Sequence, residues 1–580
     1  MTVSRLTASI ARRGLALART LPLPPAVCGC SSDGTVATPT LVSGVDELTD
    51  TFGYGPAVSL AAKILREAGG PVLFSRITTG TAGQLGAYAQ EGAGSAAAGT
   101  LSADGSNTST AIPALTGTAA DPYAVRIKCT TAGANIAANP VVQVSLDGGL
   151  TWYAADAVDV SATPTAIGDT GLLLAWTDGS FVLNDFWLAV GAACPTTGDA
   201  TGLSVLSLSG TPVDTYDVRI EITRSATTPS TGTGALRYSL DAGETWAPEQ
   251  PVPSSGVVAL GDSGVTATFS AATLVDGDIY RFKTLAPVFA AAALATTLAA
   301  FEDVTTPDHE GVIIVGAIDA TFLDEVEASH DRLIAASKPR WFLSHARDQG
   351  AAIQGETASA WVTALIGATP GFAGEYADFV VVCAGAALVT DPINDASMRR
   401  SSLHAIAPRV VAIDVAEHPG RVRSGPLALD ELVHDLAASS LAALDAQGFM
   451  GAQSIQGVEG AYATDRTRAA SGGDFTQFMR VRVMCFAARA AIARFAEEVN
   501  ETIPVNPDGT IRADVADGLD KALTSYMRRE LGARVSEVEV AVDRTVDLIT
   551  TPTLPFDLSL VPLAYATAIS LRLAFTLRSV

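Results

Sequence analysis

A segment in the middle of the chain, Ser145-Leu-Asp-Gly-Gly-Leu-Thr-Trp152, returns later as Ser239-Leu-Asp-Ala-Gly-Glu-Thr-Trp246. Further upstream in each copy, Tyr123-Ala-Val-Arg-Ile127 returns as Tyr216-Asp-Val-Arg-Ile220, and both shifts are 93 or 94 residues. Each copy consists of short alternating apolar runs between Gly, Asp and Pro turns, which is typical of a β-sandwich. We therefore expect two tandem all-β sandwich domains, at residues 121–200 and 210–288.

The repeated segment fits the Asp-box pattern S-x-D-x-G-x-T-W, which resembles turns of sialidases and other β-propellers. In a structural turn of this kind, Asp147 and Asp241 accept hydrogen bonds from turn amides, and Trp152 and Trp246 pack beneath. The alternative is a carbohydrate-binding or sialidase-like Asp-box protein. A sialidase-like propeller needs several blades and a convergent Arg cluster, whereas residues 101–290 hold two copies and seven basic residues. These numbers favour the structural turn.

Strands alternating with helices are predicted ahead of the repeats, in residues 36–100, which we expect to be the N-terminal part of a core. Pro56 suits the first turn of a helix that Gly69-Gly70 ends, and a buried strand follows at 72–77. Residues 79–120 contain almost no large apolar side chains, so we expect a linker or surface loop there.

After the repeats, residues 289–450 are expected to form an α/β domain. Short continuous apolar runs predict buried strands at 312–315, 379–382 and 410–413, and an amphipathic stretch predicts a helix at 322–336.

The C-terminal part, residues 451–580, is expected to complete the core. One helical stripe between Asp474 and Asn500 predicts a long helix, with Arg480, Arg482, Arg489 and Arg494 off the stripe. Asp514 is expected to cap a second helix that ends before Gly532, and a strand at 538–542 follows. The positions on the stripe are Phe478, Val481, Cys485, Ala488, Ile492, Phe495 and Val499.

The chain ends in a sustained period-2 pattern, which predicts a strand of about 16 residues, or roughly 50 Å. Its large side chains are Leu563, Tyr565, Thr567, Ile569, Leu571, Leu573, Phe575 and Leu577. Most strands are about five or six residues long, and an unblunted edge pairs readily with another chain. We interpret this segment as an arm that adds a strand to a neighbouring subunit, the alternative being a final strand of its own sheet. Residues 1–35 are expected to be a second arm, the alternative being disorder.

Composition excludes several function classes. The net charge of −24 argues against nucleic-acid binding, because a phosphate backbone requires a basic footprint. The most apolar internal stretch, 288–301, is too short to span a bilayer, so no membrane insertion is expected. No P-loop, G-x-G-x-x-G, H-E-x-x-H or G-x-S-x-G occurs, the histidines lack ligand spacing, and Cys28 and Cys30 form an isolated C-x-C. We therefore expect no catalytic residues, no cofactor and no metal.

Three parts of the sequence resemble phage tail sheath proteins. Leu41-Val-Ser-Gly-Val-Asp-Glu-Leu48, with the helix and strand that follow, resembles their opening, and Arg399-Arg-Ser-Ser402 through Ala416-Glu-His-Pro-Gly420 resembles the segment that enters their C-terminal domain. The order of elements from Asp474 to the last strand resembles that domain itself. The resemblance covers roughly 40–80 and 300–580, and leaves the two β repeats outside as insertions.

The resemblance implies an α+β or α/β multi-domain protein with a sheath-like α/β core formed by the N- and C-terminal parts. It also implies a structural role and no enzymatic activity. Sheath subunits form rings, commonly hexameric, that stack helically around a tail tube and contract to drive the tube through a target cell envelope. The implied partners are further copies of the chain, the tail tube protein, and baseplate and tail terminator proteins. The implied location is the virion tail, assembled in the host cytoplasm, or a related contractile injection system.

Overall fold

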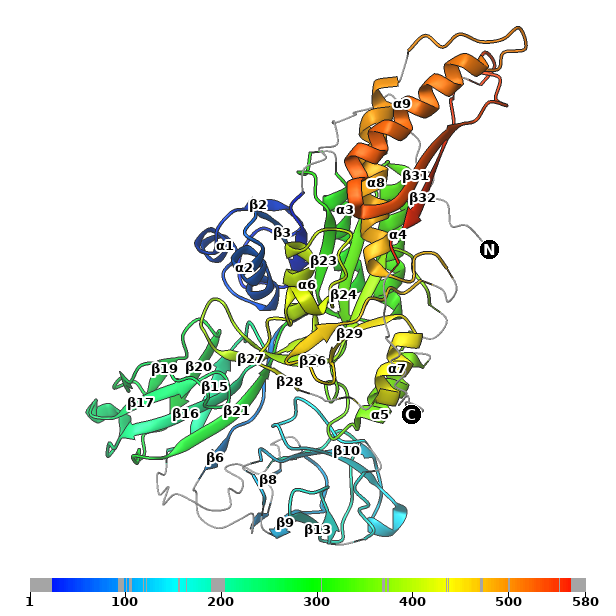
Figure 1. The fold of residues 1–580 in the computed structure, drawn as a ribbon. Coiled ribbons are helices and arrows are strands. Elements are labelled where there is room, and N and C mark those ends of the chain that lie inside the picture. The colour runs from blue at the N-terminus through cyan, green and yellow to red at the C-terminus, as the bar shows by residue number, and fades with distance from the viewer. Residues whose placement is uncertain are drawn as a thin grey trace, which may run out of the picture.

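The structure is a computed structural model. It has a central α/β layer, from which the last helix and the last two strands project at one end, and the β-rich regions lie at the other end (Figure 1). It describes residues 23–91, 99–100, 102–103, 107–117, 119–121, 123–154, 157–162, 164–188, 204–303, 305–367, 371–372, 375–433, 436, 438–469, 473–498, 501–551 and 553–564.

The central layer is one sheet with the strand order β2-β3-β1-β23-β24-β25-β29-β30. Its inner strands are parallel, and β2 and β30 are antiparallel at the two edges. Parallel strands covered on both faces read as continuous apolar runs, which is why the predicted strands at 312–315 and 379–382 are confirmed. The strands are β1 (Ala26–Gly29), β2 (Thr40–Val42), β3 (Val72–Arg76), β23 (Gly311–Ile318), β24 (Trp341–Ala346), β25 (Val380–Ala384), β29 (Phe449–Ser454) and β30 (Ala461–Ala463).

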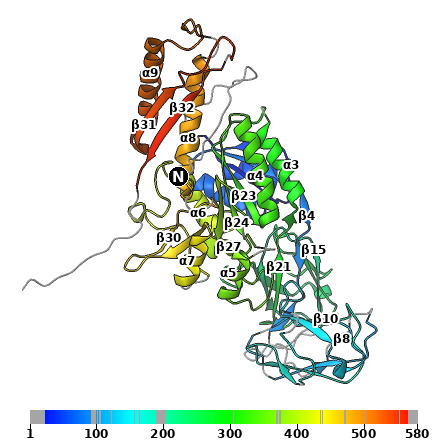
Figure 2. The ribbon, with the colours of Figure 1, turned by 90° about the vertical axis from the view of Figure 1, so that its right-hand side faces the viewer.

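Helices cover both faces of this sheet (Figure 2). Alternate residues of β23 face opposite layers: Ile313 and Val315 pack with α1, α2, α6 and α8, whereas Val312 and Ile314 pack with α3, α4, α5 and α7. The first layer consists of α1 (Val45–Phe52), α2 (Pro56–Ala68), α6 (Leu403–Ala412) and α8 (Phe478–Phe495). The second consists of α3 (Ala291–Glu302), α4 (Ala320–Ala335), α5 (Ala358–Ile366) and α7 (Ala438–Ala446).

Two sequence predictions for the core differ from the structure. The apolar run at 410–413 is the end of α6 and not a strand, because a short buried run does not distinguish the two. The segment predicted as an arm, 1–35, contains β1, which pairs with β3 on one side and β23 on the other. Four small apolar residues give too short a pattern to reveal a central strand. Residues 1–22 lie outside the described part of the chain.

Residues 99–188, here called repeat 1, form two four-stranded sheets with the orders β11-β10-β14-β8 and β12-β13-β9-β7. Apolar side chains such as Ile127, Leu174 and Trp187 are buried in one cluster that both sheets share. The strands are β7 (Gly99–Thr100), β8 (Ser102–Ala103), β9 (Pro113–Gly117), β10 (Arg126–Thr131), β11 (Val141–Ser145), β12 (Thr165–Ala166), β13 (Leu172–Trp176) and β14 (Phe186–Leu188).

Residues 204–285, here called repeat 2 together with β5 and β6 from upstream of repeat 1, form the sheets β15-β20-β19 and β18-β17-β16-β21-β5, and β6 also pairs with β21. The strands are β5 (Gln84–Leu85), β6 (Ala89–Glu91), β15 (Leu206–Gly210), β16 (Asp217–Arg224), β17 (Ala235–Ser239), β18 (Gln250–Pro251), β19 (Val257–Ala259), β20 (Val265–Phe269) and β21 (Ile279–Leu285). The prediction of a linker at 79–120 is therefore wrong, because β5 to β9 lie there and pair with the repeats. These strands are two to five residues long, and most are built from small or polar residues.

Short sheets connect the parts. β4 (Thr79–Thr81) pairs with β22 (Val288–Phe289), and β26 (Ala386–Thr390) pairs with β27 (Ser397–Ser401) and β28 (Glu431–Leu432) between the core and repeat 2. Short 3-10 turns occur at Ile136–Ala138, Pro229–Thr231, Val422–Ser424, Ala496–Glu498 and Gly532–Arg534.

The C-terminal end consists of α8, α9 (Ala513–Leu531), β31 (Val535–Val542) and β32 (Phe556–Pro562). The predicted helices, the end before Gly532 and the strand at 538–542 are confirmed. The predicted cap is wrong: Arg512 occupies the N-cap position, and Asp514 lies in the first turn, where it pairs with Arg512 at 2.8 Å. Val499 of the predicted stripe lies outside the described residues.

Candidate assembly interface

The hairpin formed by β31 and β32 has one apolar and one acidic face. Val538 and Val540 are buried against α8 and α9, and Leu558 and Leu560 pack half-buried beside them. The alternation of Val with Glu or Ala from Glu537 to Val542 of β31 produces this division, since successive side chains of a strand point to opposite faces.

The outer face of the hairpin carries Glu537 and Glu539 on β31 and Asp557 on β32, all exposed. Glu539 lies opposite Ser559, and Asp557 lies opposite Ala541, so no basic side chain stands across the hairpin from either one. None of the three carboxylates forms an ion pair or hydrogen bond with another described residue. This face is therefore a patch of negative charge that no cation of the described residues compensates.

The two edges of the hairpin differ. On the outer edge of β31, the amide of Val540 donates to Thr524 Oγ1 at 3.0 Å and the amide of Val542 to Asp520 Oδ1 at 2.7 Å, so α9 blunts this edge. Val540 lies opposite Leu558, and opposed residues of an antiparallel pair exchange either both backbone hydrogen bonds or neither. The backbone groups of Leu558 therefore also point away from the hairpin.

The backbone groups of Phe556 and Leu560, which lie two residues before and after Leu558, point in the same direction as those of Leu558. Among the described residues, no strand pairs with this edge of β32. Such a row of backbone donors and acceptors is a template for another strand.

The chain leaves β32 directly into its last residues. Leu563 is half-buried and packs against the cluster beneath the hairpin. The other predicted arm residues lie outside the described part of the chain: Tyr565, Thr567, Ile569, Leu571, Leu573, Phe575 and Leu577.

Two buried arginines fix the helix that carries the hairpin to the core. Arg482 of α8 is 2% exposed and donates to Glu310 Oε1 at 3.4 Å, and Arg489 donates to the Glu310 carbonyl at 3.2 Å. The Glu310 amide in turn donates to the Pro24 carbonyl at 3.0 Å. Glu310 thus joins α8 to the segment where the described chain begins. Sequence reasoning missed this contact, although two Arg seven residues apart on one helix face are a usable signal.

The Asp-box turn of repeat 1 is held by its aspartate. Asp147 Oδ1 accepts from the amides of Leu150 at 3.0 Å and Thr151 at 2.9 Å. Trp152 is half-buried, with its ring 6.3 Å from that of Phe186. The turn faces the core, because the Leu146 amide donates to Gln354 Oε1 at 2.9 Å and the Gln354 amide donates to the Trp152 carbonyl at 2.8 Å.

In the Asp-box turn of repeat 2 the aspartate again accepts from the threonine amide, but the Glu244 amide donates to the Asp241 backbone carbonyl, and the carboxylate forms a further bond outside the turn. Asp241 Oδ1 accepts from the Thr245 amide at 2.8 Å, and Asp241 Oδ2 accepts from the Ser397 amide of β27 at 3.0 Å. Burial acts to raise the pKa of the Asp241 carboxyl, but these bonds outweigh burial and hold the pKa below its usual range. Trp246 is half-buried and stacks on the Arg237 guanidinium at 4.5 Å. Both Asp-box turns therefore contact the core.

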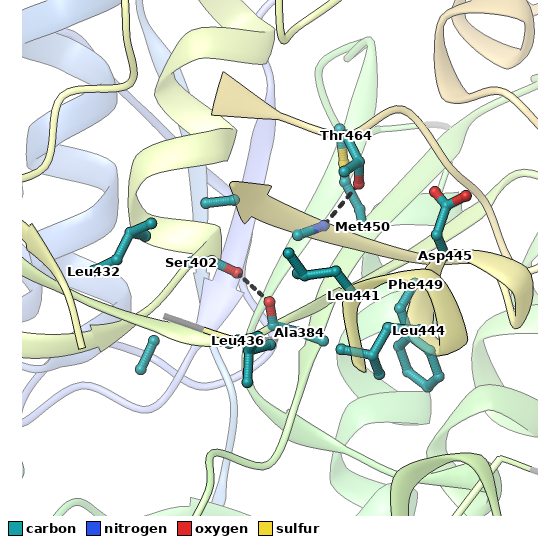
Figure 3. A pocket seen from close by; sticks show the side chains of 14 residues that line it. Ala384, Ser402, Leu432, Leu436, Leu441, Leu444, Asp445, Phe449, Met450 and Thr464 are labelled. Atoms are coloured by element: carbon teal, nitrogen blue, oxygen red, sulfur yellow. Dashed lines mark hydrogen bonds between the residues drawn. The ribbon is translucent and has the colours of Figure 1, made fainter. Parts of the chain in front are cut away.

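A cavity of about 20 Å³ lies between β29, α7 and the start of β26 (Figure 3). Most of its lining is apolar, and two of its polar groups are paired: Ser402 Oγ donates to the Ala384 carbonyl at 3.1 Å, and the Gly451 amide donates to Thr464 Oγ1 at 2.9 Å. Its volume is close to that of one water molecule, far below the hundreds of Å³ of a typical ligand pocket.

Within the residues that the structure describes, no group of three or more His, Cys, Asp or Glu side chains is placed to hold a metal ion. The same part of the chain contains no helix with the length and hydrophobicity that a bilayer crossing requires. Burial lowers the pKa of His309, His345 and His404, and lowers that of His330 to about 4.

Solved structures similar to the chain include sheath proteins. The sheath tail protein from Desulfitobacterium hafniense is 12% identical, with 94% of this chain and 98% of that chain covered and a TM-score of 0.39. The sheath tail protein from Listeria innocua is 9% identical, with coverages of 94% and 96% and a TM-score of 0.38. The contracted helical sheath of the anti-feeding prophage is 15% identical, with coverages of 50% and 77% and a TM-score of 0.35.

No curated protein matches the chain significantly. The sequence profile described as DUF2586, N-terminal domain, matches residues 26–467, a range that begins with β1 and ends just before α8. Since this match spans most of the sequence, including the central sheet and both repeats, the chain belongs to the DUF2586 family.

Proposed function

We propose that this protein is the structural subunit of a contractile tail sheath, which polymerises as stacked rings around a tail tube and contracts to drive the tube through a target cell envelope. The observation that carries the proposal is the edge of β32 with which no described strand pairs, and which is followed at once by a long alternating chain end. Backbone pairing between this end and the same edge of another copy links the subunits.

The two faces of the chain end match the two faces of the hairpin. One face of residues 563–580 is large and apolar, like the inner face of β31 and β32, and the other is small or polar and includes Arg572 and Arg578. The same segment contains no acidic residue, so it complements the exposed Glu537, Glu539 and Asp557. A one-residue slip of the added strand would place every side chain on the wrong face, which makes the register specific.

The chain end is also long enough to link copies. The pattern of about 16 residues spans roughly 50 Å, more than twice the length of β32. The first 22 residues carry Arg5, Arg12, Arg13 and Arg19 and no acid, so they suit the acidic outer face of the hairpin as a second arm. Many backbone hydrogen bonds share the load between subunits, and such links survive a change in packing during contraction.

In this proposal the N- and C-terminal parts form a sheath-like core, and repeats 1 and 2 are inserted sandwich domains on the outside. The partners are further copies in hexameric rings, the tail tube protein, and baseplate and tail terminator proteins. The location is the virion tail. The Asp-box turns act structurally, since both are occupied by contacts with the core.

Electron microscopy of the purified protein tests the proposal. We expect the full chain to form long tubes with a regular axial repeat, and a variant that ends at Ala564 to remain folded by circular dichroism without forming tubes. Leu571→Asp on the apolar face should also abolish tubes, whereas Ser570→Asp on the other face should weaken them less. Normal tubes from the truncated variant would show that the arm is not the link. Dispersed full-length monomers that cleave a sialoside would instead favour the carbohydrate-active alternative.

A further inference from the structure

The segments that lead into and out of repeat 1 lie side by side on repeat 2. On the incoming side, Gln90 of β6 pairs with Tyr280 of β21. On the outgoing side, Tyr280 Oη donates to the Ser204 carbonyl at 3.0 Å, and the Leu206 amide donates to Tyr88 Oη at 3.2 Å. The chain therefore departs from repeat 2 and returns to nearly the same place.

A strand that precedes repeat 1 completes repeat 2. In repeat 1, β8 pairs with β14 through Ala103 and Trp187. In repeat 2, β6 pairs with β21 through Gln90 and Tyr280, and Trp187 and Tyr280 are equivalent positions of the duplication. β6 thus occupies in repeat 2 the place that β8 occupies in repeat 1. Repeat 1 is nested between the first strands of repeat 2 and the remainder, an arrangement that differs from a simple tandem.

The two repeats bury their apolar residues differently. Among the described residues, the apolar cluster of repeat 1 contains residues of repeat 1 alone, from Ala111 to Trp187. The cluster of repeat 2 continues into the core, because Tyr54, Ala396 and Met398 belong to it. Parts of a protein that share one buried apolar cluster unfold together, so we expect repeat 2 and the core to unfold as one unit.

Polar contacts follow the same division. Arg400 of β27 donates to both carboxyl oxygens of Asp214 in repeat 2, each at 2.5 Å, and both side chains are buried. Breaking such a pair leaves an uncompensated buried charge. Repeat 1 is held to the core by the neutral hydrogen bonds between Gln354 and its Asp-box turn.

From these observations we infer that repeat 1 is an autonomously folding module inserted into repeat 2, whereas repeat 2 is an integral part of the core. The inference concerns the folding units of a single chain and holds whether or not that chain assembles into a sheath. If the chain does assemble, repeat 1 is the part that tubes do not require.

The duplication supplies a matched pair of substitutions. Ile127 in repeat 1 and Ile220 in repeat 2 occupy the same position of the repeated segment, and both are fully buried. Removing one methylene from each leaves the fold intact, so Ile127→Val and Ile220→Val can be compared by scanning calorimetry of the full, unassembled chain. Ile127→Val should lower the midpoint of one transition by about 5 °C, since repeat 1 is small, and leave the others unchanged. Ile220→Val should leave that transition in place and lower the midpoint of the core transition by about 2 °C.

A second variant replaces residues 92–203 with a short Gly-Ser linker between the adjacent ends. The inference predicts that the transition sensitive to Ile127→Val disappears and that the core midpoint is unchanged. The inference is overturned if Ile127→Val and Ile220→Val lower the same transition, or if the deletion shifts or abolishes the core transition. Neither readout depends on tube formation, so failure here is distinct from failure of the sheath proposal.

Discussion

Arg400 lies where β27 meets repeat 2, and its guanidinium is 5% exposed while the Asp214 carboxylate is 0% exposed. It also approaches Asp391 Oδ2 at 3.4 Å, an oxygen to which Ser59 Oγ donates at 2.6 Å and Tyr54 Oη at 2.7 Å. One residue away, Arg399 forms a half-exposed pair with Asp348. Of these two neighbouring arginines in one strand, Arg400 is therefore buried and Arg399 is half-exposed.

Replacing Arg400 should cost far more than replacing Arg399. We expect Arg400→Met to lower the free energy of unfolding of the core by about 3 to 5 kcal/mol, because two buried carboxylates lose their cation. Arg399→Met should cost less than about 1 kcal/mol, since water screens its pair. Urea unfolding followed by tryptophan fluorescence measures both. Equal losses for the two variants would show that burial does not govern this junction.

Single residues were predictable from the sequence where a repeated pattern marked them. The Asp-box pattern singled out Asp147 and Asp241, and both accept turn amides in the structure. Neither the bond from Ser397 to Asp241 nor the buried pair of Arg400 was predictable, because partners far apart in sequence leave no local pattern.

At the scale of elements, the two Asp-box turns are a natural pair of experiments. Both aspartates hold their turn, but only Asp241 also accepts an amide from the core, that of Ser397. We expect Asp241→Asn to lower the free energy of unfolding by about 2 kcal/mol, and Asp147→Asn by about 1 kcal/mol. The two values differ because Asp241→Asn also weakens the bond from the Ser397 amide, and hydrogen bonds to charged groups are the stronger ones.

This contribution of Asp241 depends on pH in a defined direction. Its pKa in the folded protein lies below the usual value of about 3.9, so its stabilisation is present above that value and is lost as pH falls through the folded pKa. The difference between the wild type and Asp241→Asn should therefore shrink below about pH 4 in equilibrium unfolding. A difference that stays constant down to pH 2 would contradict this account.

Elements with a strong period or a continuous apolar run were predictable, as with α8, α9, β23 and β31. The helix at 403–412 was mistaken in part for a strand, because burial on all sides hides the helical period. The strands between 79 and 117 were missed, since runs of two to five mostly small or polar residues acquire strand geometry only from the partner to which they bond. Tertiary pairing, and not local propensity, decides such segments.

At the scale of the whole molecule, the order of the parts was only partly predictable. The division into a flanking core and a duplicated middle follows from the sequence, but the nesting of repeat 1 within repeat 2 depends on β6, which has three residues. The assembly account rests on features at opposite ends of this long molecule (Figure 1). The repeats are fixed to the core at one end, and at the other end one edge of the hairpin is blunted by α9 and the other pairs with no strand of the described residues.

Electron cryomicroscopy of tubes formed by the full chain tests the linkage between copies most directly. The account predicts continuous density from Ala564 of one copy to a strand beside Phe556, Leu558 and Leu560 of another, with Arg572 and Arg578 on the side of Glu539. Density in which that chain end returns to its own β32, leaving every neighbouring hairpin untouched, would contradict it.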